Sequence, residues 1–292
     1  LPQSKQILIK KINKIDYANS QIEMEIWYHP DANKAKYSPS GIVPKVTNYD
    51  TIPDAAVKNF LSKYSYPNSF PAIKEFLNNK DPKYKKQKYY KSSDSIEEIF
   101  ERIENLNNSY LFIQGPPGTG KTYTSSRIII NLLKKKYKVA ILCNSHEAII
   151  NLLSSVDSYA QEINFEFNGV YRNNNHQFDR LGKNIEIRNK GSIGKLPLVD
   201  FNLFAGTAAF LGSSRFNDNS EIDKSFDYIF FDEAGQLSLT HVIASSMAAK
   251  NIVLVGDHMQ LPRPSSGAKE EGNASLSPVE YIMGEKNTID DT

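Results

Sequence analysis

The sequence predicts an α/β fold, a parallel sheet with helices on both faces, preceded by a small β-rich and helical N-terminal region. From residue 93 onward, apolar runs of strand length alternate with stretches of helical length, which is typical of such a sheet. The net charge also differs between the two parts of the chain. Residues 1–91 hold 16 Lys and no Arg against 8 Asp and Glu, a net charge of +8, whereas the rest holds 19 basic and 25 acidic side chains, a net charge of −6. We therefore predict a basic accessory region at 1–91 and a larger domain at 92–292.

Composition limits the class of protein. With 292 residues, a net charge of +2 and 40% hydrophobic residues, the chain is ordinary for a globular protein and long enough for a sizeable core. The single cysteine, Cys143, cannot form an internal disulfide or supply a cysteine zinc cluster, which favours a reducing compartment, the cytoplasm. The longest apolar run, Ile128–Leu133, is far shorter than the roughly 18 to 20 residues that cross a bilayer, so we predict no membrane partner. Because the chain opens with Leu1 rather than Met, we expect a piece of a longer protein.

The accessory region combines strands and helices. Alternating stretches at Gln6–Lys10 and Gln21–Tyr28 predict two strands, and the apolar spacing after Pro53 predicts two short helices. The region ends in a basic stretch, 83–91, in which five lysines are mixed with three tyrosines. Cations for phosphates and rings for bases would suit a nucleic-acid strand, but a solvated linker can have the same composition.

The larger domain alternates between predicted helices and strands. An amphipathic helix is predicted from Ile96, after the N-cap candidates Ser93 and Ser95. Residues 157–200 are rich in Asn and Gly and are interpreted as an insertion with one candidate strand, Phe165–Tyr171. The remaining helices are predicted at about 121–136, 146–155 and 238–249, and the strands at Tyr110–Gln114, Val139–Cys143, Phe201–Ala205, Tyr228–Phe231 and Ile252–Val255.

The strongest signal is a glycine-rich loop between a predicted strand and a predicted helix. Residues 115–122, GPPGTGKT, match the phosphate-loop pattern G-x-x-x-x-G-K-[ST] in the context that this pattern requires. The glycines let backbone N–H groups turn toward phosphate oxygens, at the positive N-terminus of the following helix. Lys121 would reach the β and γ phosphates, and Thr122 would hold Mg²⁺. The alternative is a glycine turn that binds nothing. The predicted nucleotide-binding residues are Gly115, Pro116, Pro117, Gly118, Thr119, Gly120, Lys121, Thr122 and Tyr123.

Two further segments follow predicted strands. Asp232 and Glu233 come directly after the apolar run 228–231, at the strand end where parallel sheets place their chemistry. Asp232 can hold Mg²⁺ and Glu233 can act as general base on the attacking water, although a surface turn is the alternative. The third segment, GDHMQLP at 256–262, places Gln260 where it could sense a γ phosphate, but ordinary loop chemistry gives the same pattern.

In this order, GPPGTGKT, DEAGQ and GDHMQLP resemble the nucleotide-binding core of superfamily-one helicases, within the branch of the nonsense-mediated-decay helicase and the replicative helicase-nuclease. The longer segments FIQGPPGTGKTYT, CNSHEAIINLL, FAGTAAF and VGDHMQLPRPSSG are similar to the helicase half of bacterial proteins that fuse a RecB-like nuclease to such a helicase. The resemblance covers residues 93–292 well and residues 1–92 weakly. It implies a RecA-like fold, hydrolysis of ATP with Mg²⁺, and a motor acting on single-stranded nucleic acid, with DNA favoured over RNA.

The resemblance also implies roles for residues outside the phosphate loop. Lys121 and Gln260 match the phosphate ligand and the γ-phosphate sensor, and Gln236 would couple the state of the nucleotide to nucleic acid. The residues that would contact the nucleic-acid backbone are Asn144, Ser145, His146 and Thr207. Such side chains can donate to phosphate oxygens, but a helix cap accounts equally well for the first two.

Two of the departures from the family pattern bear on the expected activity. No glutamine lies between Gln87 and Gln114, where the family has a glutamine that reads adenine, so selectivity for ATP over other nucleotides is open. The family's second RecA-like domain supplies arginines worth about 10³ to 10⁵ in rate, and none follows Thr292 in this sequence. We therefore expect very slow hydrolysis by this chain alone, with a second RecA-like domain and, by resemblance, a fused nuclease in the full-length protein. The alternatives are an ATPase that remodels proteins and a catalytically silent nucleotide-binding module.

Overall fold

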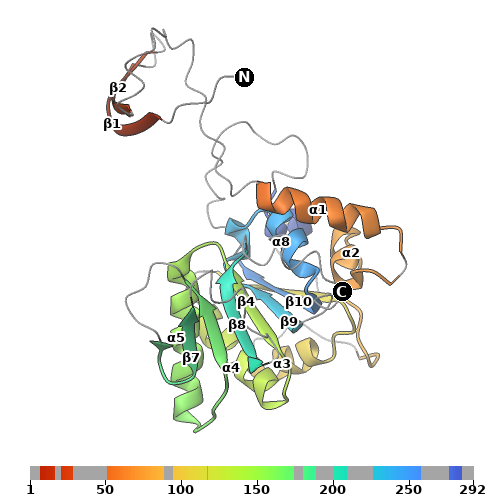
Figure 1. Cartoon of the computed structure of the whole chain (residues 1–292). Coiled ribbons are helices and arrows are strands. Elements are labelled where there is room, and N and C mark those ends of the chain that lie inside the picture. The colour runs from red at the N-terminus through yellow and green to blue at the C-terminus, as the bar shows by residue number, and fades with distance from the viewer. Residues whose placement is uncertain are drawn as a thin grey trace. The chain divides into compact units, whose positions relative to one another are not determined.

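The computed structural model describes residues 7–16, 21–28, 51–66, 68–88, 95–116, 118–173, 180–188, 200–208, 226–257 and 276–284 (Figure 1). The chain divides into two compact units, residues 1–45 and 46–292, and each is described by itself. Two predicted site residues, Pro117 and Gln260, lie outside the described residues, as does the end of the basic stretch at 89–91.

The first unit contains an antiparallel pair of strands, β1 (Ile7–Asp16) and β2 (Gln21–Tyr28). The pairing register shifts twice along β1, which is the signature of β-bulges. Both predicted strands are present, and the first runs to Asp16 instead of ending at Lys10.

The second unit is built on an eight-stranded sheet with the strand order β3-β10-β9-β4-β8-β5-β7-β6. Neighbouring strands are parallel except for β6 and β7, which form an antiparallel pair. This mostly parallel sheet confirms the predicted α/β class. In sheet order the strands are β3 (Tyr110–Gln114), β10 (Ala249–Gly256), β9 (Phe226–Phe231), β4 (Val139–Cys143), β8 (Leu203–Thr207), β5 (Gly169–Arg172), β7 (Ile185–Arg188) and β6 (Arg180–Leu181).

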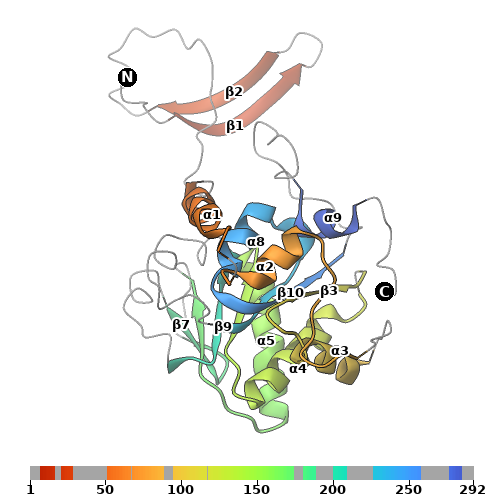
Figure 2. The same cartoon turned by 90° about the vertical axis from the view of Figure 1, so that its right-hand side faces the viewer.

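Helices cover both faces of the sheet (Figure 2). The strands alternate accordingly: in β10, Val253 and Val255 belong to one buried cluster, and Ile252 and Leu254 to the other. None of the helices in the described ranges has the length and apolarity needed to cross a membrane. The cluster that contains Val253 and Val255 lies under α3 (Ile96–Glu104), α4 (Lys121–Lys134) and α5 (His146–Glu162). The cluster that contains Ile252 and Leu254 lies under α1 (Thr51–Lys63), α2 (Pro71–Leu77), α8 (Leu239–Ser246) and α9 (Pro278–Met283).

Helices α1 and α2 fall in the predicted accessory region but pack in the second unit. The ring of Phe76 in α2 meets Tyr110 of β3 edge-on, with 5.5 Å between the ring centroids. The hydroxyl of Tyr281 in α9 donates to the carbonyl oxygen of Leu77 at 2.6 Å. Because Phe60 and Phe76 are buried in the core of the second unit, the division between compact units falls between residues 45 and 46 rather than after residue 91.

Much of the segment interpreted as an insertion, 157–200, is part of the sheet and its helical layer. Helix α5 runs to Glu162, and β5 and β7 extend the sheet beyond β8. Asp157 holds the turn between β6 and β7, because its carboxylate accepts from the backbone N–H groups of Lys183 at 3.1 Å and Asn184 at 2.9 Å. Gly182 in this turn has a φ of +68°, and a Cβ added there would collide with the Asp157 carboxylate.

Candidate nucleotide-binding and catalytic site

The predicted phosphate loop leaves the carboxyl end of β3 and leads directly into α4. The N–H group of Gly115 donates to the carbonyl oxygen of Gly256 at 3.0 Å, so the loop begins against the end of β10. Gly118 and Gly120 both have a φ of +80°, in the left-handed region that favours glycine. Gly115 is needed for another reason, because an added Cβ would lie 2.8 Å from the Thr119 Oγ1. The structure therefore explains each of the three glycines of the loop without reference to a ligand.

Lys121 folds back over this loop. Its Nζ donates to the carbonyl oxygens of Gly115 at 2.5 Å and Pro116 at 2.9 Å. The Thr119 hydroxyl donates to the same Pro116 oxygen at 2.8 Å. A cation is thus held in the turn at the N-terminus of α4, where backbone N–H groups lack intrahelical partners and favour an anion.

The two acidic residues lie at the carboxyl end of β9. The N–H group of Asp232 donates to the carbonyl oxygen of Leu142 in β4 at 3.0 Å, which fixes the end of the strand. The pKa of Asp232 is raised to about 6, chiefly by burial and further by the charge of Glu233. Two groups lower it in part: the N–H of Glu233, which donates to Asp232 Oδ1 at 3.0 Å, and the charge of Lys121. Burial and the nearby charge of Glu147 raise the pKa of Glu233, and Lys121 again lowers it.

Lys121 begins α4 after the loop that leaves the carboxyl end of β3, and Asp232 and Glu233 follow the carboxyl end of β9, which is parallel to β3 through β10. The charge of Lys121 also lowers the pKa of both acids. The structure therefore brings the loop lysine and the acidic pair to the same edge of the sheet. This arrangement is the one that a triphosphate with a bound cation requires, although the roles of the individual residues stay predictions.

The backbone at this turn is strained in a way that the sequence did not reveal. Glu233 has a φ of +51°, which is unfavourable for a residue with a side chain. It is followed by the short 3₁₀ helix η4 (Ala234–Gln236), which contains the half-buried Gln236. A Cβ on Gly235 would lie 3.1 Å from the Asp257 carbonyl oxygen, so the glycine lets the segment DEAGQ pack closely against the end of β10.

The residues predicted to hold Mg²⁺ fit that ion by their chemistry. Thr122 offers a hydroxyl oxygen at the start of α4, and Asp232 offers a buried carboxylate, both of the hard oxygen type that Mg²⁺ prefers. In the described ranges no three His, Cys, Asp or Glu side chains gather as a metal-binding group. Mg²⁺ usually takes one or two protein ligands together with phosphate oxygens and water, so such a group is not required.

The residues predicted to contact nucleic acid lie at the same edge, on neighbouring strands. Thr207 ends β8, and it pairs with Cys143 at the end of β4. Asn144, Ser145 and His146 follow β4 directly and are exposed. The Ser145 hydroxyl accepts from the N–H of Ala148 at 3.1 Å, so the cap interaction that was the alternative for this residue is present.

His146 is held by two residues that the sequence did not single out. Its Nδ1 lies 2.7 Å from the Tyr171 hydroxyl, and Asn173 donates to the same hydroxyl at 3.2 Å. Partial burial and the charge of Arg172 lower the pKa of His146. The relevant signal was present, because the candidate strand 165–171 contained Tyr171, but only the strand pairing of β5 with β8 brings it to this edge.

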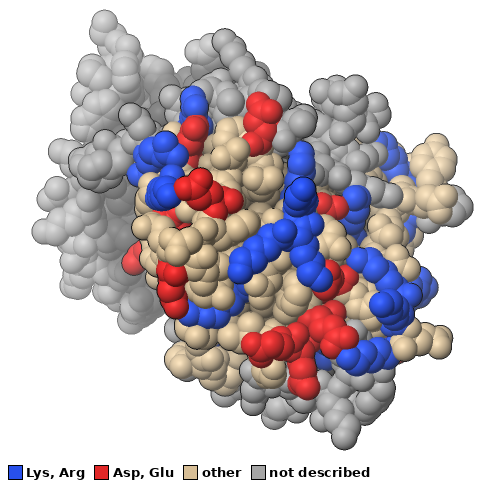
Figure 3. Space-filling view, turned by 90° about the horizontal axis from the view of Figure 1, so that it is seen from below, with Lys and Arg blue, Asp and Glu red and all other residues tan. Residues whose placement is uncertain are grey.

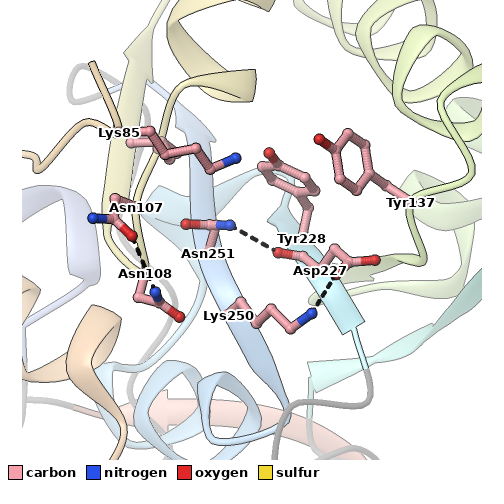
Figure 4. Close-up of a pocket in the computed structure, with 9 residues that line it drawn as sticks. Lys85, Asn107, Asn108, Tyr137, Asp227, Tyr228, Lys250 and Asn251 are labelled. Atoms are coloured by element: carbon pink, nitrogen blue, oxygen red, sulfur yellow. Dashed lines mark hydrogen bonds and ion pairs between the residues drawn. The ribbon is translucent and has the colours of Figure 1, made fainter. Parts of the chain in front are cut away.

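A separate pocket of about 190 Å³ opens at the other end of the strands (Figure 4). Its polar groups are engaged with one another: Lys250 pairs with the Asp227 carboxylate at 2.7 Å, and the Asn251 side chain donates to the Asp227 carbonyl oxygen at 3.1 Å. On the face seen from below, basic and acidic side chains are interspersed rather than gathered into one basic surface (Figure 3). We assign no ligand to this pocket. Its lining comprises Lys85, Leu106, Asn107, Asn108, Tyr137, Asp227, Tyr228, Lys250 and Asn251.

Comparison with known proteins gives one family and several relatives. The family model described as "Type III restriction enzyme, res subunit" (ResIII) matches residues 84–255. The DNA replication ATP-dependent helicase/nuclease dna2 of Schizosaccharomyces pombe is 32% identical over 183 residues, which cover 61% of this chain and 12% of that protein. The Homo sapiens DNA replication ATP-dependent helicase/nuclease DNA2 is 29% identical over 162 residues, which cover 54% of this chain and 14% of that protein. The chain thus spans a small part of the length of these relatives.

Solved structures with a related arrangement are more distant. A nuclease-deletion mutant of the Type ISP restriction-modification enzyme LlaGI, in complex with a DNA substrate mimic, matches with a TM-score of 0.39 and 18% identity over 59% of this chain and 17% of that chain. The Sulfolobus solfataricus SWI2/SNF2 ATPase core in complex with double-stranded DNA matches with a TM-score of 0.39 and 12% identity over 70% of this chain and 38% of that chain.

Proposed function

The chain belongs to the ResIII family, and from that premise we propose that it is the nucleotide-hydrolysing motor domain of a nucleic-acid helicase or translocase. The observation that carries the proposal is that Lys121, Asp232 and Glu233 all follow carboxyl ends of parallel strands, at the loop-bearing edge of the sheet. The names of the relatives in Schizosaccharomyces pombe and Homo sapiens support a helicase motor, and they favour the branch of the replicative helicase-nuclease.

In this proposal the residues divide the work of hydrolysis. Amides of the loop 115–120 and the N-terminus of α4 bind the phosphates, and Lys121 offsets the negative charge that grows on the γ phosphate. Glu233 orients a water molecule for in-line attack and takes its proton, a role that its raised pKa favours near neutral pH. Mg²⁺ held by Thr122 and Asp232 would neutralise phosphate charge. We keep Gln260 as the proposed γ-phosphate sensor.

The remaining partners are also part of the proposal. Single-stranded nucleic acid, with DNA favoured, would bind across the ends of β4 and β8 at Asn144, Ser145, His146 and Thr207, and Gln236 would transmit the state of the nucleotide. A second RecA-like domain in the full-length protein would close the site with its arginines. A fused nuclease and a cytoplasmic location complete the proposal.

Two substitutions test the division of work. We expect Lys121→Ala to lose ATP binding, because it removes the cation that meets the phosphates. We expect Glu233→Gln to keep ATP binding and lose single-turnover hydrolysis, because it removes the base and leaves the loop intact. ATP affinity is measured by calorimetry and hydrolysis by release of labelled phosphate.

Matched controls are available on exposed positions of the same layer. Lys134→Ala in the last turn of α4 and Glu162→Gln at the end of α5 should change neither quantity. Equal loss of binding in Lys121→Ala and Glu233→Gln would refute the separate roles. ATP hydrolysis that single-stranded DNA does not stimulate, in the protein with its second domain, would favour protein remodelling instead.

A further inference from the structure

The end of α1 and the turn that follows it carry a cluster of exposed apolar and aromatic side chains. Five large hydrophobic side chains are exposed in the described ranges, and three of them lie within six residues of one another. They are Leu61, 61% exposed, Tyr64, 39% exposed, and Tyr66, 64% exposed. Single exposed apolar side chains are ordinary, whereas a group of them is typical of a binding surface. We call residues 58–66 the tyrosine turn.

The charged side chains of this segment are basic. Residues 56–80 contain four lysines and one acid, Glu75. Glu75 is 6% exposed and forms an ion pair with Lys83, so the segment presents no acidic side chain at its surface. Lys58 is exposed and Lys63 is half-buried, and both belong to α1. The tyrosine turn therefore combines cations with exposed rings, which is the chemistry that complements a polyanion with aromatic bases.

Lys74 of α2 fixes the shape of the turn. Its Nζ donates to the carbonyl oxygen of Tyr66 at 2.6 Å and to the Ser69 hydroxyl at 2.9 Å. The same Nζ lies 5.2 Å from the centroid of the Tyr64 ring, and the Asn78 side chain donates to the Tyr64 hydroxyl at 3.1 Å. The backbone at Tyr66 and the ring of Tyr64 are thus held in place before a partner arrives, which reduces the entropy lost on binding.

The basic stretch 83–88 has a different character, although its composition made it a candidate contact for nucleic acid. Acidic side chains of the same domain neutralise its ends: Lys83 pairs with Glu75, and Lys88 lies 2.6 Å from the Glu101 carboxylate. Ion pairs of this kind reduce the attraction for phosphates. The tyrosine turn is therefore better suited than the basic stretch to bind a nucleic-acid strand.

The helix that carries the turn packs close to the proposed nucleic-acid contacts. Helix α1 lies against α8 (Figures 1 and 2). The Ser245 hydroxyl in α8 donates at 2.8 Å to the carbonyl oxygen of Ala208, the residue after Thr207. One helix, α8, thus contacts both α1 and the end of β8.

We propose that the tyrosine turn is a second binding surface for single-stranded nucleic acid, apart from the ends of β4 and β8. Lys58 and Lys63 meet backbone phosphates, and a base stacks on the ring of Tyr66. A duplex keeps its bases stacked on one another, so the ring favours single strands. Binding at this surface goes beyond the proposed function, because it requires neither a nucleotide nor the residues at the strand ends.

Fluorescence anisotropy of a labelled oligothymidine of about 20 nucleotides, with the 292-residue chain and no nucleotide, tests the surface. Tyr66→Ala should weaken binding about tenfold, whereas Tyr66→Phe should keep the affinity because it keeps the ring. Lys58→Gln combined with Lys63→Gln should lower the slope of log affinity against log salt by about 1.4, since each phosphate contact of a single strand contributes about 0.7. Lys134→Gln, at an exposed lysine of α4 in the other helical layer, is the matched control and should change neither quantity.

Failure of this surface and failure of the proposed function give different results. Unchanged affinity in Tyr66→Ala with an unchanged salt slope in the lysine variant overturns the surface, and so does an unaltered chain that binds no oligothymidine at low salt. Tyr66→Ala that loses affinity for phosphatidylserine vesicles but not for oligothymidine also overturns it, because the turn then meets a membrane. A loss of oligothymidine affinity in Tyr66→Ala, with ATP binding unchanged, supports the surface. If Ser145→Asp leaves that affinity unchanged as well, the tyrosine turn stands and the proposed contacts at the strand ends fail.

Discussion

The buried carboxylate of Asp232 should cost the protein stability, so removing its charge should stabilise the fold. Asp232 is 7% exposed, and its pKa in the folded chain is raised from the ordinary value of 3.8 to about 6. The substitution Asp232→Asn removes the charge and keeps an oxygen that can accept from the N–H of Glu233. We expect this variant to unfold at a higher temperature than the unaltered chain near pH 8, in buffer free of metal and nucleotide.

The size and the pH dependence follow from the raised pKa of Asp232. Each pKa unit corresponds to about 1.4 kcal/mol, so the rise from 3.8 to about 6 corresponds to about 3 kcal/mol. Between these values the folded state binds more protons than the unfolded state, and stability therefore falls as the pH rises from about 4 to about 6. Above this window the full penalty of about 3 kcal/mol is present, with the attraction of Lys121 already included in it, and Asp232→Asn recovers only part of it because its own polar amide must be buried. We expect a gain of about 2 kcal/mol at pH 8, shrinking toward zero as the pH falls to about 4.

Asp157 supplies a matched control of opposite sign. It is 3% exposed, yet its pKa is lowered: burial raises it, but hydrogen bonds from Asn184, Lys183 and Gln161 outweigh burial. A group with a depressed pKa stabilises the fold above its unfolded pKa, and this contribution is lost as the pH falls through the folded pKa. Asp157→Asn should therefore destabilise the protein at pH 8 by about 2 kcal/mol, because an amide turns a donor toward groups that need an acceptor.

Thermal unfolding of the unaltered chain, Asp232→Asn and Asp157→Asn from pH 5 to pH 8 tests whether the buried charge of Asp232 destabilises the fold. A gain of about 2 kcal/mol should raise the midpoint of unfolding by roughly 4 to 8 °C for a domain of this size. An Asp232→Asn variant that is less stable than the unaltered chain at pH 8 would refute the reasoning. So would a difference that does not change with pH, because the charge would then not be its origin.

Two further predictions concern local structure. Gly182→Ala should destabilise the chain by about 3 kcal/mol in urea unfolding, because the added methyl group collides with the Asp157 carboxylate at a residue with a positive φ. Gly284→Ala is the control, at φ +56° with no atom within 4 Å of the added Cβ, and should cost about 1 kcal/mol. Equal costs for the two substitutions would contradict the collision. Ser145→Ala should cost about 1 kcal/mol as a lost cap of α5. Ser145→Asp should keep the cap and weaken binding of single-stranded DNA in fluorescence anisotropy, and unchanged DNA affinity would leave Ser145 with the cap role alone.

The sequence predicted strands β3 and β4 well because each is a continuous apolar run bounded by turn residues. Tyr110–Gln114 and Val139–Cys143 have the predicted bounds, since both faces of a parallel strand are buried and period-2 patterning is not needed to recognise it. The placement of Lys121 and Asp232 at one edge of the sheet also follows from the sequence, because the carboxyl ends of parallel strands lie together.

The sequence could not place the elements whose burial depends on distant partners. The segment 169–188 is short in apolar residues, and β5 joins the sheet through pairing with β8, which lies more than 30 residues away in the chain. Helices α1 and α2 have ordinary amphipathic patterns that name no partner, and only the structure shows Phe76 against Tyr110. The left-handed conformation of Glu233 leaves no mark in the sequence either, since glycine or asparagine would be expected at such a position.

The strain at residues 232 and 233 is an argument for the site that is independent of any motif. A turn selected for stability alone would have glycine at 233, where φ is +51°, and an uncharged residue at 232, where burial raises the pKa of the carboxyl group to about 6. Both costs fall on adjacent residues, and the charge of Lys121 offsets only part of the rise in the pKa of each acid. A bound cation would remove the penalty at Asp232, so the turn has the energetics of a site that is completed by a positive charge. This is why the same substitution, Asp232→Asn, should make the fold more stable and the motor inactive.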